Sequence, residues 1–225
     1  PEPDFMPESL YGVESKSPLK DFDGIGFSLQ YELSYPTVLK MLDMSAIPVR
    51  NENRTDEHPI ILAGGPCTFN PLPMCEFIDV FCIGDGEEMM VEVCRVLEKT
   101  KGLPRNARIA ELCKIKGCWS REGVNRNILS STEGKDSAEA GFSPVEKRLS
   151  PLINEYTPTA YPIPFSSSVH DRAIVEIRRA CGRMCRFCQP GHVTLPIRER
   201  EAEDIIKITK ELVNNTGYDE YSLLS

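Results

Sequence analysis

The chain has 225 residues, a net charge of −8 and 40% hydrophobic residues. This length and composition suit one large folded domain or two small ones and exclude a disordered protein. The acidic balance argues against general nucleic-acid binding. No apolar run approaches the ~18 residues of a membrane-spanning helix, and no signal peptide opens the chain. We therefore expect a cytoplasmic protein without membrane contact.

Strands and helices are predicted to alternate up to about residue 118. Three short apolar runs suit buried strands: 25–29, 59–63 and 79–83. Three segments suit helices: 36–46, 87–99 and 105–118. In the second helix, Met90, Val91, Cys94, Val96 and Leu97 are predicted to face the core. This order predicts a Rossmann-like α/β domain over 1–118, with a parallel sheet and helices on both faces.

Residues 119–170 are predicted to be an irregular linker, because Asn, Ser, Gly and Pro are frequent and no apolar period is present. A second βα unit follows in 171–225. Its predicted elements are a strand over 173–177, a helix over 201–215 and a strand over 218–224. The helix is predicted to bury Ile205, Ile206, Ile208 and Leu212. One helix and two strands cannot bury their own faces, so we expect the opening of a larger, truncated barrel or sheet. The chain begins with Pro1, and an N-terminal part is expected to be missing as well.

Nine cysteines fall into two groups. Six are scattered among apolar neighbours: Cys67, Cys75, Cys82, Cys94, Cys113 and Cys118. An odd count without regular spacing argues against a secreted disulfide scaffold. Buried free thiols in a reducing compartment are the simpler interpretation.

The other three cysteines form a C-x3-C-x2-C pattern at Cys181, Cys185 and Cys188, directly after the predicted strand 173–177. Three such close thiolates can converge on one metal centre, and soft sulfur ligands favour an iron–sulfur cluster or zinc. A four-iron cubane held by three cysteines leaves one iron open for catalysis. Alternatively, His192 completes a Cys3His zinc site, which would indicate a non-catalytic binding module. Inert cysteines are a weaker interpretation because the loop is polar.

The charge around this pattern is uneven. Residues 171–200 hold seven arginines against three acidic residues, which leaves four positive charges there and −12 on the remainder. Such a collar suits an anionic cofactor, an anionic substrate or an acidic electron donor, although an arginine-rich solvated surface explains it equally well.

The cysteine loop resembles the signature of the radical S-adenosylmethionine (SAM) superfamily, including an aromatic residue, here Phe187, before the last cysteine. The resemblance implies a partial TIM barrel in which Cys181, Cys185 and Cys188 hold a [4Fe–4S] cluster. It also implies that the fourth iron binds SAM, that an electron cleaves SAM to a 5′-deoxyadenosyl radical, and that Phe187 lies near SAM. A flavodoxin- or ferredoxin-like electron donor is expected, and the substrate and catalytic residues stay unknown.

Two glycine turns carry a second resemblance. Gly64-Gly65 and Gly84-Asp85-Gly86-Glu87 are similar to two loops of the cobalamin-binding domain that precedes many radical SAM enzymes, in particular a poorly characterised bacterial subgroup. The resemblance implies that Gly64, Gly65, Gly84, Gly86 and Glu87 contact cobalamin, which would relay a methyl group to an unactivated carbon. The sequence departs from that pattern, since Cys67 replaces the usual histidine and the D-x-H-x-x-G ligand motif is absent. A vestigial domain that only docks the substrate is the alternative.

Overall fold

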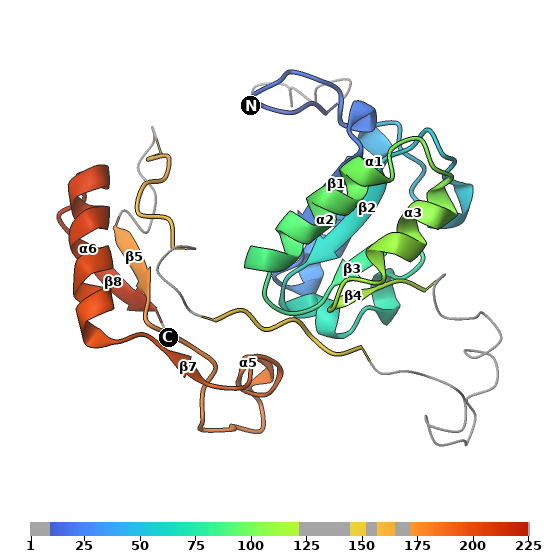
Figure 1. Cartoon of the computed structure of the whole chain (residues 1–225). Helices are drawn as coiled ribbons and strands as arrows, with labels where there is room; N and C mark the ends of the chain where they lie inside the picture. Colours follow the sequence, from blue (N-terminus) through green and yellow to red (C-terminus); the bar gives the residue numbers. More distant parts are fainter. Residues whose placement is uncertain (1–9, 122–144, 152–156, 165–171, 225) are drawn as a thin grey trace, which may run out of the picture. The chain divides into compact units, whose positions relative to one another are not determined.

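The computed structural model describes residues 10–121, 145–151, 157–164 and 172–224 (Figure 1). The chain divides into two compact units, residues 1–149 (unit 1) and 150–225 (unit 2). No helix within the described residues has the length and apolar character needed to cross a bilayer.

Unit 1 is built on a four-stranded sheet in the order β1-β2-β3-β4. The strands are β1 (Gly24–Ser28), β2 (Ile60–Gly64), β3 (Val80–Cys82) and β4 (Cys118–Trp119). The first three are parallel, and β4 runs antiparallel to β3. The three predicted strands are confirmed. The predicted helix 105–118 is too long, because its last residues turn back to pair with β3 instead of continuing the helix.

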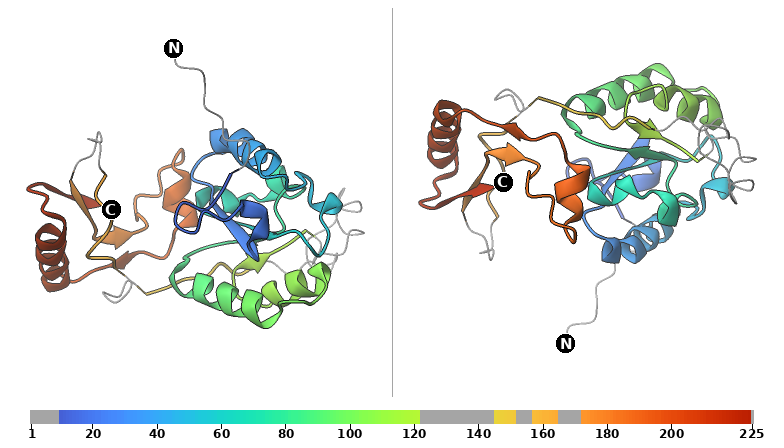
Figure 2. Two further views of the ribbon diagram at one scale, coloured as in Figure 1. Left: turned by 90° about the horizontal axis from the view of Figure 1, so that it is seen from above. Right: turned by 90° about the horizontal axis from the view of Figure 1, so that it is seen from below.

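Helices cover both faces of this sheet, as predicted (Figure 2). They are α1 (Tyr35–Met44), α2 (Glu87–Lys99) and α3 (Arg105–Leu112). The short 3-10 helices are η1 (Leu19–Asp21), η2 (Glu32–Ser34), η3 (Asn51–Asn53), η4 (Pro66–Phe69) and η5 (Leu72–Met74). Strand β2 is buried on both sides, since Ile61 belongs to the core under α1 while Ile60 and Leu62 belong to the core under α2 and α3. A strand alternates its side chains between faces, so β2 links both cores.

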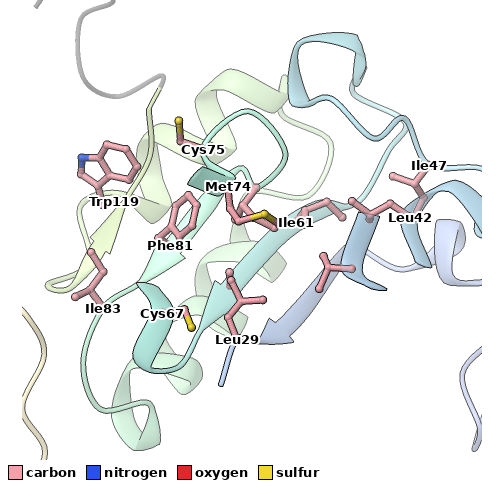
Figure 3. Close-up of a cluster of buried hydrophobic side chains, with 13 residues drawn as sticks. Leu29, Leu42, Ile47, Ile61, Cys67, Met74, Cys75, Phe81, Ile83 and Trp119 are labelled. Atoms are coloured by element: carbon pink, nitrogen blue, oxygen red, sulfur yellow. The ribbon is translucent and has the colours of Figure 1, made fainter. Parts of the chain in front are cut away.

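The core under α1 is drawn in Figure 3. Phe81 and Trp119 contact each other there with ring centroids 5.6 Å apart. Cys67 and Cys75 lie in the same cluster and are buried, as the sequence predicts for them.

The buried face of α2 differs from the prediction. Met89, Val93 and Leu97 are buried, whereas Met90, Val91 and Cys94 are exposed. Both sets contain apolar residues at helical spacing, so the sequence pattern is ambiguous by about one residue. Of the α2 residues predicted to face the core, Leu97 is buried and Val96 is partly buried.

A buried ion network closes the amino end of this sheet. The Asp79 carboxylate accepts hydrogen bonds from the Arg54 guanidinium at 3.0 Å, from Ile61 N at 2.6 Å and from the Arg105 guanidinium. Both arginines also donate to backbone carbonyls of the loops before β2 and β3, including Phe77 at 2.7 Å. The network therefore ties these loops to the sheet from inside.

Unit 2 contains two small sheets. Strand β5 (Ala173–Glu176) pairs in parallel with β8 (Tyr221–Leu224), and β6 (Arg178–Arg179) pairs antiparallel with β7 (Arg198–Glu199). Its helices are α5 (Gln189–Val193) and α6 (Ala202–Thr216). The predicted strand, helix and parallel strand are confirmed with shifts of one to three residues at their ends. Gly217 ends α6 with a left-handed φ of 75°.

Helix α6 packs against β5 through Ile208 and Leu212, with Ile205 partly buried beside them. Ile206 is 54% exposed, so its predicted burial is wrong. It lies on the opposite side of the helix from Ile208. Of the predicted linker, residues 122–144, 152–156 and 165–170 lie outside the described residues, and Tyr161 packs against the unit 2 core.

Candidate metal centre

The three cysteines lie on one loop between β6 and α5, after the parallel strand β5. Ala180 and Met184 in this loop have left-handed φ angles of 71° and 51°. Such angles are uncommon for residues with a side chain, so the local backbone is held in a specific shape. Gly182 lies against Ile197, whose Cδ1 is 3.0 Å from the position a Cβ on Gly182 would occupy.

The three cysteines of the loop differ in exposure. Cys181 and Cys185 are exposed, Cys188 is half-buried, and all three are free thiols. Cys188 N donates to Cys185 O at 3.0 Å, which forms a turn between the last two cysteines. Within the described residues, no three His, Cys, Asp or Glu side chains are grouped as a metal-binding set. Convergence of the three thiolates therefore stays a prediction.

His192 lies on α5 and contacts the same turn. Its Nε2 is 3.1 Å from Cys185 O, so one of the two ring nitrogens is used by the loop backbone. This contact fits a histidine that orders the cysteine loop, and it leaves the other ring nitrogen able to bind a metal, as the zinc alternative requires.

The arginine-rich region separates into two groups. Arginines of the strands hold structural contacts: Arg179 forms a bidentate pair with Glu176 at 2.8 and 2.9 Å, and Arg178 pairs with Glu199 at 3.0 Å. Arg183 and Arg186 lie inside the cysteine loop, are exposed, and form no ion pair with any residue that the structure describes. The second pair is thus available to stabilise negative charge at the loop.

These residues fit an iron–sulfur cluster by their chemistry. Three soft thiol donors lie within one short loop, none is consumed by a disulfide, and two exposed guanidinium groups lie on the same loop. Phe187 is 92% exposed and Met184 is 45% exposed, so apolar side chains also lie at the surface of the loop.

The predicted cobalamin turns lie in unit 1 and are explained by the chain's own packing. Gly65 has a φ of 97°, and a Cβ there would lie 2.7 Å from Leu29 O. Gly84 has a φ of 111°, and a Cβ there would lie 2.6 Å from Arg148 N and still closer to its carbonyl oxygen. At both positions glycine is required by neighbouring backbone.

The segment 145–149 fills the space beside Gly84. Arg148 N donates to Ile83 O at 2.9 Å, and Asp85 N donates to Arg148 O at 3.0 Å. The guanidinium of Arg148 then pairs with Glu88 at 2.9 Å and with Glu92 at 2.7 Å, both on α2. Chain residues therefore occupy the carboxyl end of β3, where an open α/β sheet usually binds its ligand.

The environment of the other residues predicted to contact cobalamin does not indicate a bound ligand either. Cβ positions on Gly64 and Gly86 meet neighbours only at 3.9 and 3.7 Å, which is ordinary contact. Glu87 begins α2 and is half-buried. Cys67 is 4% exposed. Burial, together with a hydrogen bond to Cys67, raises the pKa of Tyr35 to about 12, so the half-buried phenol lies against the buried thiol. The described residues do not fit a corrin ring at these turns.

Two structural features were missed in the sequence analysis. Arg148 lies in the predicted linker, and nothing in its sequence context indicates a partner more than sixty positions earlier. The buried network of Asp79, Arg54 and Arg105 joins three distant positions, and charged residues are rarely predicted to be buried.

Comparison with known proteins gives two findings. A family described as radical SAM proteins, N-terminal, matches residues 6–120. An uncharacterized protein of Methanocaldococcus jannaschii is 26% identical over 219 residues, which cover 96% of this chain and 41% of that protein. The chain thus spans less than half the length of this relative. The family match includes the whole sheet of unit 1, and the relative's match extends over the cysteine loop. Because the family matches more than half of its residues, the chain belongs to the radical SAM proteins.

Proposed function

We propose that this chain is part of a radical SAM enzyme in which Cys181, Cys185 and Cys188 hold a [4Fe–4S] cluster. The observation that carries the proposal is the C-x3-C-x2-C loop of free cysteines, two of them exposed, after the parallel strand β5. When bound, the cluster supplies the electron for reductive cleavage of SAM. Family membership of unit 1 supports this activity independently of the loop.

The chain's own residues shape the loop and its charge. The bidentate pair of Arg179 with Glu176 fixes the backbone where β5 leads into the loop. Contact of His192 with Cys185 O orders the turn that carries the second and third thiols. Arg183 and Arg186 would supply positive charge to a net-negative cluster held by this loop and to the carboxylate of SAM. Phe187 offers an exposed aromatic surface on which the adenine of SAM can pack.

The exposed apolar side chains of unit 2 support the proposal of further barrel strands. Ile174 is 48% exposed and Leu224 is 55% exposed on the β5–β8 sheet, so further strands of a partial TIM barrel would cover this sheet. A small acidic electron donor of the flavodoxin or ferredoxin kind suits the two loop arginines. We further propose a cytoplasmic enzyme, since an exposed cluster needs a reducing compartment. The substrate is not identified by any residue of this chain.

Cobalamin-dependent methyl transfer, which the resemblance to cobalamin-binding domains implies, is not part of the proposed function. Gly65 and Gly84 face Leu29 and Arg148 instead of an open crevice. We therefore propose an enzyme whose unit 1 does not hold a corrin at these turns, which favours a docking or structural role for this unit.

The test is anaerobic reconstitution with iron and sulfide, followed by iron analysis and low-temperature EPR of the reduced full-length parent protein with and without SAM. We expect roughly four irons per chain, as a cubane contains, and a signal that shifts when SAM is added. The variant Cys185→Ala should lose the signal. The matched control is Cys94→Ala, because Cys94 is also exposed but lies on α2 in unit 1. A colourless protein with stoichiometric zinc would overturn the proposal and support the binding module that uses His192.

A further inference from the structure

The pairing of β3 with β4 brings two buried cysteines opposite each other. Cys82 is the register partner of Cys118, between the pairs Phe81–Trp119 and Ile83–Gly117. Ile83 N donates to Gly117 O at 2.8 Å, which makes that pair the hydrogen-bonded kind. Hydrogen-bonded and non-hydrogen-bonded pairs alternate in antiparallel strands, so Cys82 and Cys118 form a non-hydrogen-bonded pair with Cα atoms about 4.5 Å apart. That separation falls within the range that disulfides span.

Both thiols point to the same side of the sheet. Cys82 and Cys118 belong to the core under α2 and α3 and are 4% and 6% exposed. The Cys118 thiol donates a hydrogen bond to the Cys82 sulfur, which lowers the pKa of Cys82 and raises that of Cys118. Cys113 packs against the same core, and burial raises the pKa of its thiol to about 11. The two sulfurs of Cys82 and Cys118 therefore lie in direct contact on one face of the sheet.

We propose that Cys82 and Cys118 are an oxidisable pair that forms a cross-strand disulfide when the protein meets a hydroperoxide. The Cys82 thiolate attacks the O–O bond of hydrogen peroxide, which forms a sulfenic acid and releases hydroxide. The Cys118 sulfur then attacks the Cys82 sulfur, forms the S–S bond and displaces the oxygen as water. Two thiols lose two electrons in total, and one peroxide is reduced to two waters.

The position of the pair gives the disulfide a local effect. Strand β4 has two residues and lies at the edge of the sheet, so opening of this edge admits a molecule as small as peroxide. The turn before β4 contacts the segment 145–149, because a Cβ on Gly117 would lie 3.1 Å from Arg148 N. A bond between β3 and β4 would therefore fix the sheet edge on which Arg148 docks. This inference is independent of the cluster in unit 2.

The experiment treats the 225-residue chain with hydrogen peroxide, blocks the remaining thiols by alkylation under denaturing conditions, and maps unreduced peptides by mass spectrometry. We expect a peptide pair linked through Cys82 and Cys118 that dithiothreitol separates. Thermal unfolding followed by the fluorescence of Trp119 should shift upward by about 5–10 °C, and the shift should be lost after reduction. Peptide mapping also keeps the reactions of Cys181, Cys185 and Cys188 distinct from this pair.

The variants Cys118→Ser and Cys94→Ser are a matched pair. The first should abolish both the linked peptide and the thermal shift, and the second should leave both unchanged, since Cys94 is exposed on α2. Recovery of Cys82 and Cys118 in alkylated form after peroxide treatment would overturn the proposal, as would a link of either one to Cys113. If Cys118→Ser folds poorly, peptide mapping of the unsubstituted chain still shows whether Cys82 and Cys118 form the disulfide.

Discussion

Unit 1 and unit 2 differ in where their polar side chains lie. In unit 1 the decisive charged residues are turned inward or docked on the sheet: Asp79 binds two buried arginines at the amino end, and Arg148 binds α2 at the carboxyl end. In unit 2 the polar and thiol side chains of the cysteine loop are mostly exposed, including Cys181, Cys185 and the two loop arginines. Unit 1 is stabilised through its own closed packing, whereas unit 2 exposes two of the three candidate cluster ligands.

The family match and the candidate cluster ligands lie in different units. The family match covers residues 6–120, which lie in unit 1. The candidate cluster ligands all lie in unit 2, where the buried hydrophobic core is small and one sheet is partly exposed. A substitution that damages one unit should therefore leave the other largely unaffected, and three experiments test this.

The largest effect is expected from Asp79→Ala. Removal of the carboxylate leaves the buried guanidinium groups of Arg54 and Arg105 without their counter-ion, which should cost about 3–5 kcal/mol. Urea unfolding followed by Trp119 fluorescence measures unit 1 specifically, because Trp119 is the single tryptophan and is 7% exposed. Iron loading of the cysteine loop should be retained.

The control for this substitution is Asp23→Ala. Asp23 forms an exposed ion pair with Lys101 at 3.1 Å, and the loss of such a pair should cost less than about 1 kcal/mol. Equal destabilisation by the two variants would contradict the assigned role of the buried network.

An intermediate effect is expected from Gly84→Ala, which tests the docking of segment 145–149. The new Cβ strains a left-handed backbone and collides with the Arg148 backbone, so we expect a loss of at least about 2 kcal/mol. Gly102→Ala is the matched control, because Gly102 has a φ of 83° but no neighbour within 4 Å of the added atom. It should cost only about 1 kcal/mol. Hydrogen exchange in 145–149 should rise in the first variant alone; unchanged exchange would argue that Arg148 does not require this glycine.

The smallest effects are expected in unit 2, where adjacent residues of β5 can be compared. Val175 is fully buried against α6, so Val175→Ala should cost about 2 kcal/mol. Ile174 is 48% exposed on the other face, and Ile174→Ala should cost about 0.5 kcal/mol or less. Hydrogen exchange of α6 peptides measures the effect of both substitutions, because Trp119 lies in unit 1 and its fluorescence does not follow unit 2. A larger effect at Ile174 would show that this face is already covered within the chain.

The sequence predicts the strands and helices well because their patterns are local. Strands β1, β2, β3 and β5 and helix α2 lie within one or two residues of the predicted ranges. The helix over 105–118 was overextended, since the pairing of Cys118 and Trp119 with β3 depends on residues more than thirty positions away. The buried face of α2 differs from the prediction because two sets of its apolar residues, offset by about one position, both repeat at helical spacing.

The candidate cluster loop was predicted from sequence alone, because its information is the spacing of three cysteines on a short segment. The structure adds the exposure of the loop and the contact of His192 with Cys185. The glycine turns show the opposite case. A glycine at a strand end is compatible both with a bound cofactor and with close backbone packing, and local sequence cannot distinguish the two.

The sequence by itself therefore determined the α/β pattern and the spacing of the cysteine loop, both of which depend on neighbours along the chain. Only the tertiary structure decided that Arg148 occupies the space beside Gly84, that Asp79 joins two buried arginines, and that Cys82 faces Cys118. Each of these contacts joins residues from distant segments. Their partners are set by sheet order and register, which arise from the packing of the whole unit.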